Sequence, residues 1–225
     1  MRPQRSCNRR VSRTKPVHMK PSPSPSQAGA WRSIFDGTSK DGWAMVGPGE
    51  LRLEDGVLVT YGGMGLLWYS KEQFGDCQIR VVFKLTKPED NSGIFIRIPE
   101  PPADPWFAVH KGYEVQIFNP ADEFHRTGCF YSLTKARQAV DAKAGDWNEI
   151  LITLDGPRTL VEVNGVLVTE HNEGDPVPEK KIWYEPERGP RPRRGFIGLQ
   201  NHDDNSRVQF REVSVRPLTG SSSGS

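Results

Sequence analysis

The stretch TLVEVNGVLVTE, residues 159–170, contains two apolar runs joined by Asn164-Gly165. An Asn-Gly pair supplies the two positive-φ positions of a type I′ turn, which joins antiparallel strands directly. The stretch therefore predicts a β-hairpin. A second pattern, CQIRVVFKL at residues 77–85, is apolar at every second position beginning with Cys77. Such alternation is typical of a strand with one buried face.

Short runs of this kind recur along the chain from Trp31 onward, separated by clusters of Gly, Pro, Asp and Asn. Helical periodicity is not sustained anywhere, and we expect at most a short turn near residues 133–140. So many strands predict an all-β domain of two packed antiparallel sheets, a jelly-roll sandwich, with a closed barrel as the alternative. The other runs are residues 56–61, 65–70, 92–98, 112–118, 149–156, 195–201 and 208–218.

The composition of the two ends differs from that of the body. Residues 1–30 hold seven Lys and Arg residues, no acidic residue and the repeat PSPSPS. We therefore predict a disordered basic Pro/Ser tail at 1–30, a single sandwich domain at 31–218 and a flexible tail at 219–225. Subtracting the seven tail residues from the 30 basic residues leaves 23 against 28 acidic, a net charge of −5. This mildly acidic body gives no electrostatic reason to expect a nucleic-acid partner.

Targeting signals and cysteine motifs are also absent from the sequence pattern. No apolar run follows Arg9-Arg10, and no stretch approaches the roughly 20 apolar residues of a membrane span. The three cysteines form no CxxC pair, and Cys77 falls on the predicted core face. We therefore expect a cytoplasmic protein without a membrane partner, disulfides or structural zinc.

Polar side chains mark the non-core face of three predicted strands. Successive strand residues point to opposite faces, so the apolar set of each strand leaves a polar set on the other side. If the three strands are neighbours, they form one concave polar face with an aromatic floor, which suits a carbohydrate. The alternative is an ordinary solvated sheet face. The sets are Asn91, Phe95 and Arg97; Glu114 and Gln116; and Gln200 and His202.

Four motifs, in this order and spacing, resemble the 3-keto-disaccharide hydrolase domain family: DNSGIFIRI (90–98), GYEVQIF (112–118), GDWNEILITLDG (145–156) and GFIGLQNHDD (195–204). The resemblance extends over residues 31–218 and implies a concanavalin A-like sandwich. It also implies hydrolysis of glycosides that are oxidised to a ketone at sugar carbon 3. The residues that fall on the family's recurrent motifs are Asn91, Ser92, Gly93, Arg97, Glu114, Gln116, Gln200 and His202.

The strand around Glu114 argues against ordinary glycosidase chemistry. Sandwich-fold glucanases of the laminarinase kind use the motif E-x-D-x-x-E, but here Gln116 and Asn119 replace two of its carboxylates. Ordinary glycosidases need a carboxylate pair. A ketone at carbon 3 instead acidifies the proton on carbon 2, so that one base, one acid and a group that stabilises the enolate suffice.

The predicted roles follow from this chemistry. Glu114 and His202 supply the base and the acid, in either order, and Arg97 with Asn91 stabilises the enolate. Gln116, Gln200 and Phe95 bind the sugar. No cofactor is required, although a divalent cation held by Glu114, His202 and Asp203 is compatible with the residue types.

Two other functions fit the same sequence. A lectin-like carbohydrate-binding module would use the same polar face without cleaving the sugar. A conventional β-glucanase would need carboxylates from other strands, such as Asp203 or Glu162. His110, His125 and His171 lie in polar, loop-like stretches and are interpreted as ordinary surface residues. All three functions imply a carbohydrate partner, and the sequence leaves the oligomeric state open.

Overall fold

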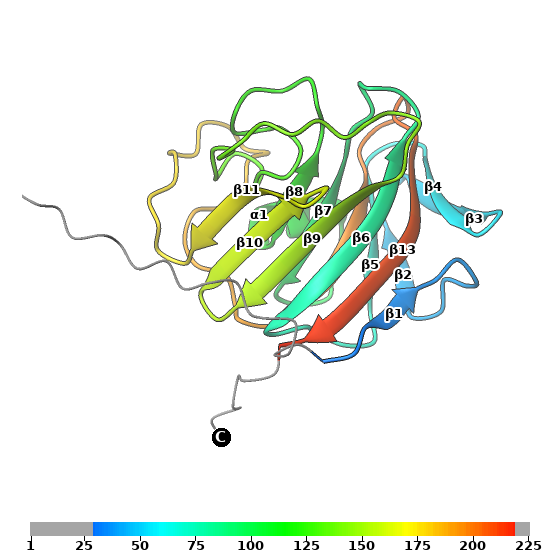
Figure 1. Cartoon of the computed structure of the whole chain (residues 1–225), viewed down its shortest axis with the longest axis horizontal. Helices are drawn as coiled ribbons and strands as arrows, with labels where there is room; N and C mark the ends of the chain where they lie inside the picture. The colour runs from blue at the N-terminus through cyan, green and yellow to red at the C-terminus, as the bar shows by residue number, and fades with distance from the viewer. Residues whose placement is uncertain (1–28, 219–225) are drawn as a thin grey trace, which may run out of the picture.

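The structure, a computed structural model, describes residues 29–218; the tail predictions for residues 1–28 and 219–225 lie outside the described residues. Two antiparallel β-sheets pack face to face, and one short helix lies on the outside of the smaller sheet (Figure 1). The predicted all-β sandwich is confirmed. No helix within 29–218 has the length and apolar character needed to span a membrane.

The larger sheet contains eight strands. They are β1 (Arg32–Phe35), β3 (Glu50–Glu54), β4 (Val57–Tyr61), β6 (Cys77–Leu85), β9 (Asn148–Asp155), β10 (Arg158–Val163), β11 (Val166–Asn172) and β13 (Val208–Pro217). Their order across the sheet is β11-β10-β9-β6-β13-β4-β3, and β1 also pairs with β13. This sheet faces the viewer in Figure 1 and lies opposite the smaller sheet, which contains the polar strands that the sequence singled out.

The smaller sheet contains five strands. They are β2 (Trp43–Val46), β5 (Gly65–Tyr69), β7 (Ser92–Ile98), β8 (Tyr113–Ile117) and β12 (Phe196–Asn201). Their order is β2-β5-β12-β7-β8. Strands β12, β7 and β8 are therefore neighbours, which is the arrangement that a shared polar face requires.

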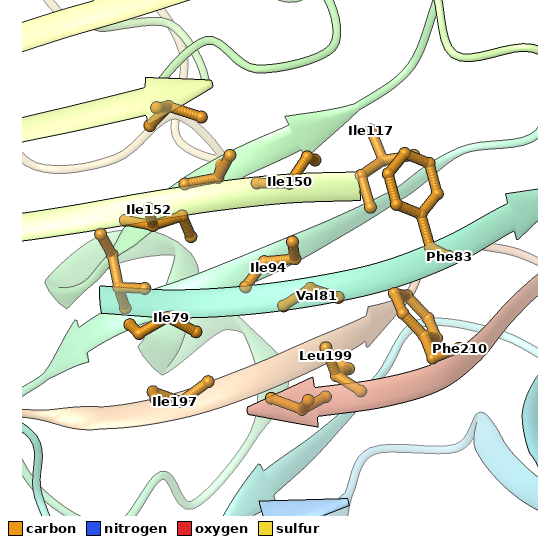
Figure 2. Close-up of a cluster of buried hydrophobic side chains, with 14 of the residues drawn as sticks. Ile79, Val81, Phe83, Ile94, Ile117, Ile150, Ile152, Ile197, Leu199 and Phe210 are labelled. Atoms are coloured by element: carbon orange, nitrogen blue, oxygen red, sulfur yellow. The ribbon is translucent and has the colours of Figure 1, made fainter. Parts of the chain in front are cut away.

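The hydrophobic core lies between the two sheets. Figure 2 shows Ile79 and Val81 of β6 near Ile94 and Leu199 of the smaller sheet. All four side chains are completely buried. Burying one such side chain stabilises a fold by about 1.5–3 kcal/mol, so these contacts fix which face of each strand points inward. The intervening residues of the smaller sheet must then point away from the core.

The hairpin predicted from Asn164-Gly165 joins β10 to β11. Both residues have positive φ, 50° and 79°, as a type I′ turn requires, so this prediction is confirmed. The Asn164 side chain also accepts a hydrogen bond from the Glu149 backbone N–H at 2.9 Å. The turn is thereby tied to the neighbouring strand β9.

Helix α1 (Pro105–Lys111) was not predicted. Its seven residues are too few to show a helical period. A start signal does exist, because Asp104 accepts a hydrogen bond from the Phe107 N–H at 3.0 Å and Pro105 occupies the first turn. The helix matters for function because it covers part of the outer face of the smaller sheet.

Candidate active site

A pocket of about 460 Å³ lies on the outer face of the smaller sheet. This volume falls within the range of small-molecule sites. Strands β8 and β12 contribute Glu114, Gln116 and Gln200, and helix α1 with the surrounding loops contributes most of its walls. Asn91 directly precedes β7, and His202 directly follows β12. The lining residues are Met64, Asn91, Trp106, Val109, Glu114, Gln116, Phe118, His125, Tyr131, Tyr184, Gln200 and His202.

Five of the seven predicted site residues line this pocket. They come together because the strands are neighbours and because the apolar residues between them point into the core. Their catalytic and binding roles remain predictions. The five are Asn91, Glu114, Gln116, Gln200 and His202.

Phe95 does not reach the pocket. Phe95 of β7 pairs with Glu114 of β8, so it lies on the outer face of the sheet, as the alternation of side chains along the strand predicted. Its side chain is nevertheless completely buried, in a small apolar cluster with Trp68 and Val109 of α1. The prediction that Phe95 contacts substrate is therefore wrong, because the unpredicted helix covers that part of the sheet.

Arg97 also lies outside the pocket, and its predicted place beside Glu114 is wrong. Phe196 pairs with Ile98 whereas Gly198 pairs with Phe95, so β7 carries an extra residue at this point. Such a bulge breaks the alternation of faces, and Arg97 has a φ of +54°. The prediction that Arg97 stabilises an enolate is therefore wrong, because its side chain does not reach the pocket.

The Arg97 side chain instead links the two sheets. Arg97 is 1% exposed, and its guanidinium donates to the Gly156 carbonyl at 2.8 Å and the Pro192 carbonyl at 3.1 Å. Gly156 lies between β9 and β10, in the larger sheet. The role of Arg97 in this position is structural.

Arg97→Met tests this structural role. The variant keeps the apolar stem and leaves two carbonyls without a donor, which costs about 1–3 kcal/mol in the free energy of unfolding. Urea denaturation measures the loss, and turnover per folded molecule should stay near that of the parent. A variant of unchanged stability that has lost turnover would contradict this assignment.

Glu114 lies at the bottom of the pocket and is 6% exposed. Its carboxyl group lies over Gly93 of the next strand, where a Cβ atom would stand only 2.5 Å from Oε1. A side chain at position 93 would therefore displace the Glu114 carboxyl group from its present position. The Gln200 side chain hydrogen-bonds the carboxyl group from β12.

Burial raises the pKa of Glu114 to about 8, although the hydrogen bond from Gln200 opposes the shift. At neutral pH the carboxyl group is therefore mostly protonated. A protonated carboxyl group can donate a proton, but it cannot accept one. The sequence left open which of the two residues is the acid and which the base. The protonated state of Glu114 favours Glu114 as the acid and His202 as the base.

His202 is oriented by its neighbour in the chain. Its Nδ1 lies 2.8 Å from Asp203 Oδ2, while Asp203 Oδ1 accepts the backbone N–H groups of Asn205 and Ser206. Burial opposes ionisation of Asp203, but the hydrogen bonds from His202 and the two N–H groups lower its pKa. The charged carboxylate thus holds Nδ1 as the donor and leaves Nε2 as the basic nitrogen.

His125 forms a second pair of the same kind and was not predicted as a site residue. It lines the pocket, and its Nδ1 lies 2.7 Å from Asp122 Oδ1. Burial opposes ionisation of Asp122, but the Phe124 N–H and His125 lower its pKa. The only sequence signal is the Asp-x-x-His spacing, which is common in loops and has little specificity.

Tyr131 is another lining residue that strand periodicity missed, because it lies in irregular chain. Its backbone N–H donates to the Glu114 carbonyl at 2.9 Å, and the Gly128 N–H donates to the Gln116 carbonyl at 2.8 Å. Residues 128–131 thus pair with the edge of β8. Burial, followed by the nearby Glu114, raises the pKa of Tyr131 to about 12, so its hydroxyl is a donor at neutral pH.

Two buried oxygens in the pocket have no hydrogen-bond partner, Asn91 Oδ1 and Gln200 Oε1. Gln200 is only 2% exposed. Buried polar atoms in native proteins nearly always have a partner, so we expect these two acceptors to receive hydrogen bonds from a bound ligand or from water. A sugar, with its row of hydroxyl groups, meets this requirement.

Glu114 is the one carboxylate among the described residues that line the pocket. Glu162 belongs to β10, in the larger sheet. Asn119 serves the structure, since its amide group donates to the Ala142 carbonyl at 2.8 Å. The carboxylate pair of a conventional glucanase is therefore missing from this pocket.

Metal ligands are not grouped in the part of the chain that the structure describes, where no set of three or more His, Cys, Asp and Glu side chains is arranged to hold an ion. Glu114, His202 and Asp203 thus do not form a ligand set. Asp203 is instead bonded to His202 and to two backbone N–H groups.

Comparison with known proteins adds the family and the fold. A protein-family model described as a 3-keto-alpha-glucoside-1,2-lyase-like domain matches residues 30–216. A search among curated proteins finds no match.

Similar solved structures include two proteins of Parabacteroides distasonis ATCC 8503 that are provisionally described as glycosyl hydrolases. One is 24% identical to this chain with a TM-score of 0.66, and the alignment covers 84% of this chain and 100% of that protein. The other is 23% identical with a TM-score of 0.63, and covers 89% and 95%. The carbohydrate-binding module CBM66 of Bacillus subtilis is 12% identical with a TM-score of 0.55, and covers 82% and 98%. These likenesses agree with the sandwich fold.

Proposed function

Because the chain belongs, over residues 30–216, to the family of 3-keto-alpha-glucoside-1,2-lyase-like domains, we propose that it cleaves glycosides whose sugar ring carries a ketone at carbon 3. One observation supports this most: a single buried carboxyl group, Glu114, whose pKa is raised to about 8, shares its pocket with two histidines that are each held by an aspartate. That set lacks the carboxylate pair of ordinary glycosidases, but it contains the base and the acid that a ketone substrate needs.

The first step is removal of the proton on carbon 2. His202 Nε2 takes this proton, and the electron pair forms a double bond between carbons 2 and 3 with negative charge on the former ketone oxygen. Donors placed near that oxygen stabilise the enolate. The Tyr131 hydroxyl and the Gln116 amide, which both line the pocket, are the candidates for this role.

The second step releases the leaving group. The ketone re-forms, a double bond forms between carbons 1 and 2, and the bond between carbon 1 and the glycosidic oxygen breaks. Glu114 donates its proton to the departing oxygen. Water then adds its hydroxyl group to carbon 1 and a proton to carbon 2, so that the overall reaction is hydrolysis. Elimination without this addition is the lyase reaction that the family description names.

A carbohydrate-binding module is the second candidate, favoured by the likeness to CBM66 and by the two unpartnered amide oxygens. It would bind the sugar through Asn91 and Gln200 without using Glu114 as an acid. The two functions differ in whether product forms.

The deciding experiment offers methyl 3-keto-α-glucoside and unoxidised methyl α-glucoside in D₂O, with product followed by NMR and binding followed by calorimetry. We expect turnover of the ketone alone, with solvent deuterium entering carbon 2 faster than in the enzyme-free control. Binding without turnover would identify a module. Cleavage of the unoxidised glycoside would identify a conventional glycosidase.

A further inference from the structure

Three aromatic side chains are exposed at or beside the pocket, and we call them the aromatic rim: Trp106, Trp183 and Tyr184. They are 36%, 64% and 40% exposed and, together with Ile182 at 41%, are the large exposed hydrophobic residues of the described chain. The Trp106 and Trp183 rings lie 4.8 Å apart, and the Trp183 and Tyr184 rings 5.7 Å apart. Apolar side chains gathered in this way on a surface mark a binding site.

The rim is continuous with the pocket. Trp106 and Tyr184 line it, whereas Trp183 lies outside it and contacts both of them. A sugar bound over Glu114 would therefore extend its leaving group toward Trp183. A second ligand unrelated to the substrate is not needed to explain the exposed rings.

The rim is held in place by bonds between α1 and the loop that carries it. His110 Nε2 lies 3.0 Å from the Trp183 carbonyl, and Lys111 forms a 2.7 Å ion pair with Glu187. Within the loop, Glu185 accepts the Lys181 N–H at 2.9 Å. A surface that is already ordered loses little conformational entropy on binding, as a ligand site requires.

The chemistry of the rim favours an aromatic ring over a second sugar. The polar side chains beside it are already engaged, since Glu185 bonds Arg188 at 2.9 Å and Lys111 bonds Glu187. Sugar hydroxyls would find there only the two indole N–H groups and the Tyr184 hydroxyl of the rim itself. The Trp106 and Trp183 planes meet at 53°, so a flat ring stacked on one meets the other at an angle, as aromatic groups prefer.

We propose that the aromatic rim binds the leaving group of the substrate, and that this group is an apolar aromatic ring. The inference rests on the proposed function, because it places the sugar over Glu114. It goes further by naming the class of leaving group: aryl or arylalkyl 3-keto-glucosides rather than 3-keto-disaccharides.

The test compares 2-phenylethyl, methyl and glucosyl (disaccharide) 3-keto-α-glucosides, since all three release an alcohol. In the parent protein, we expect the 2-phenylethyl compound to have the lowest KM. Trp183→Ala should reduce the preference for 2-phenylethyl over methyl by roughly five- to tenfold, and Trp183→Phe should restore most of it. Trp147→Ala, on the other side of the sandwich, is the control and should leave the preference unchanged.

The outcomes separate this inference from the proposed function. If the parent turns over the methyl compound but shows no preference for the 2-phenylethyl compound, the rim assignment is overturned and the proposed function stands. The same holds if the parent shows this preference and Trp183→Ala leaves it unchanged. If no compound is turned over, calorimetry with the same three compounds still tests the rim. Sedimentation that shows a dimer dissociating in Trp183→Ala would instead assign the rim to a second copy of the chain and overturn the inference.

Discussion

Replacing Glu114 by glutamine lowers kcat on methyl 3-keto-α-glucoside by about 100-fold or more, because the leaving oxygen then departs without a proton donor. Glutamine has nearly the same shape and can still accept the hydrogen bond from Gln200. The fold and the shape of the pocket are therefore retained. KM should change much less than kcat, since the lost interaction forms as the bond breaks.

Glu212→Gln is the matched control for this variant. Glu212 is a carboxylate of β13 that pairs with Arg80 at 2.5 Å, in the larger sheet and away from the pocket. The same substitution there should leave kcat within about twofold of the parent, as surface changes remote from a site usually do. Equal turnover by Glu114→Gln and Glu212→Gln would remove Glu114 from the mechanism.

The strands were predictable because one face of each is buried. Ten of the thirteen strands, β4 to β13, coincide with runs that the sequence analysis identified. The missed strands β1, β2 and β3 are short, at four or five residues, and lie between the turns of the opening segment. A period of two cannot be established over the four residues of β1 or of β2. The five residues of β3, ELRLE, do alternate, and this strand was missed although the pattern was present.

Five of the seven predicted site residues line the pocket because side chains alternate between the two faces of a strand, and the other two show the limit of that rule. The alternation tells which face a residue occupies, but it does not tell what covers that face. Phe95 is on the predicted face and is buried by α1. Arg97 follows a bulge, after which the alternation no longer applies.

The remaining lining residues lie outside the strands: Trp106 and Val109 belong to α1, which is too short to show a helical period, and the others lie in loops, which have no period at all. His125, Tyr131 and Tyr184 reach the pocket through tertiary contacts, such as the bonds between residues 128–131 and β8. The ionisation state of Glu114 was equally beyond the sequence, since it follows from burial over Gly93. The choice between acid and base therefore needed the fold.

The raised pKa of Glu114 also predicts how stability depends on pH. Below the ordinary value of 4.5, Glu114 is protonated in both the folded and the unfolded chain. Between pH 4.5 and about 8 the unfolded chain loses this proton while the folded chain keeps it, so the free energy of unfolding falls as pH rises. The fall is at most about 1.4 kcal/mol per pH unit, and it ends above the folded pKa.

Glu114→Gln has no proton to lose at this position and should lack that fall. The stability of the variant relative to the parent therefore increases by a few kcal/mol between pH 5 and pH 8.5, measured by urea denaturation at each pH. Subtracting the two proteins removes the titration of every other group. The variant that loses catalysis thus gains stability relative to the parent as the pH rises.

Glu212→Gln is again the control, with the opposite sign of shift. Burial opposes ionisation of Glu212, but hydrogen bonds from Ser214 and Arg80 lower its pKa. Its contribution to stability is therefore present above the unfolded pKa and is lost only as pH falls through the folded value. Between pH 5 and pH 8.5 this variant should differ from the parent by a nearly constant amount. If the free energy of unfolding of Glu114→Gln also differed from that of the parent by a constant amount over this pH range, Glu114 would be ionised in the folded protein. It could then not serve as the acid.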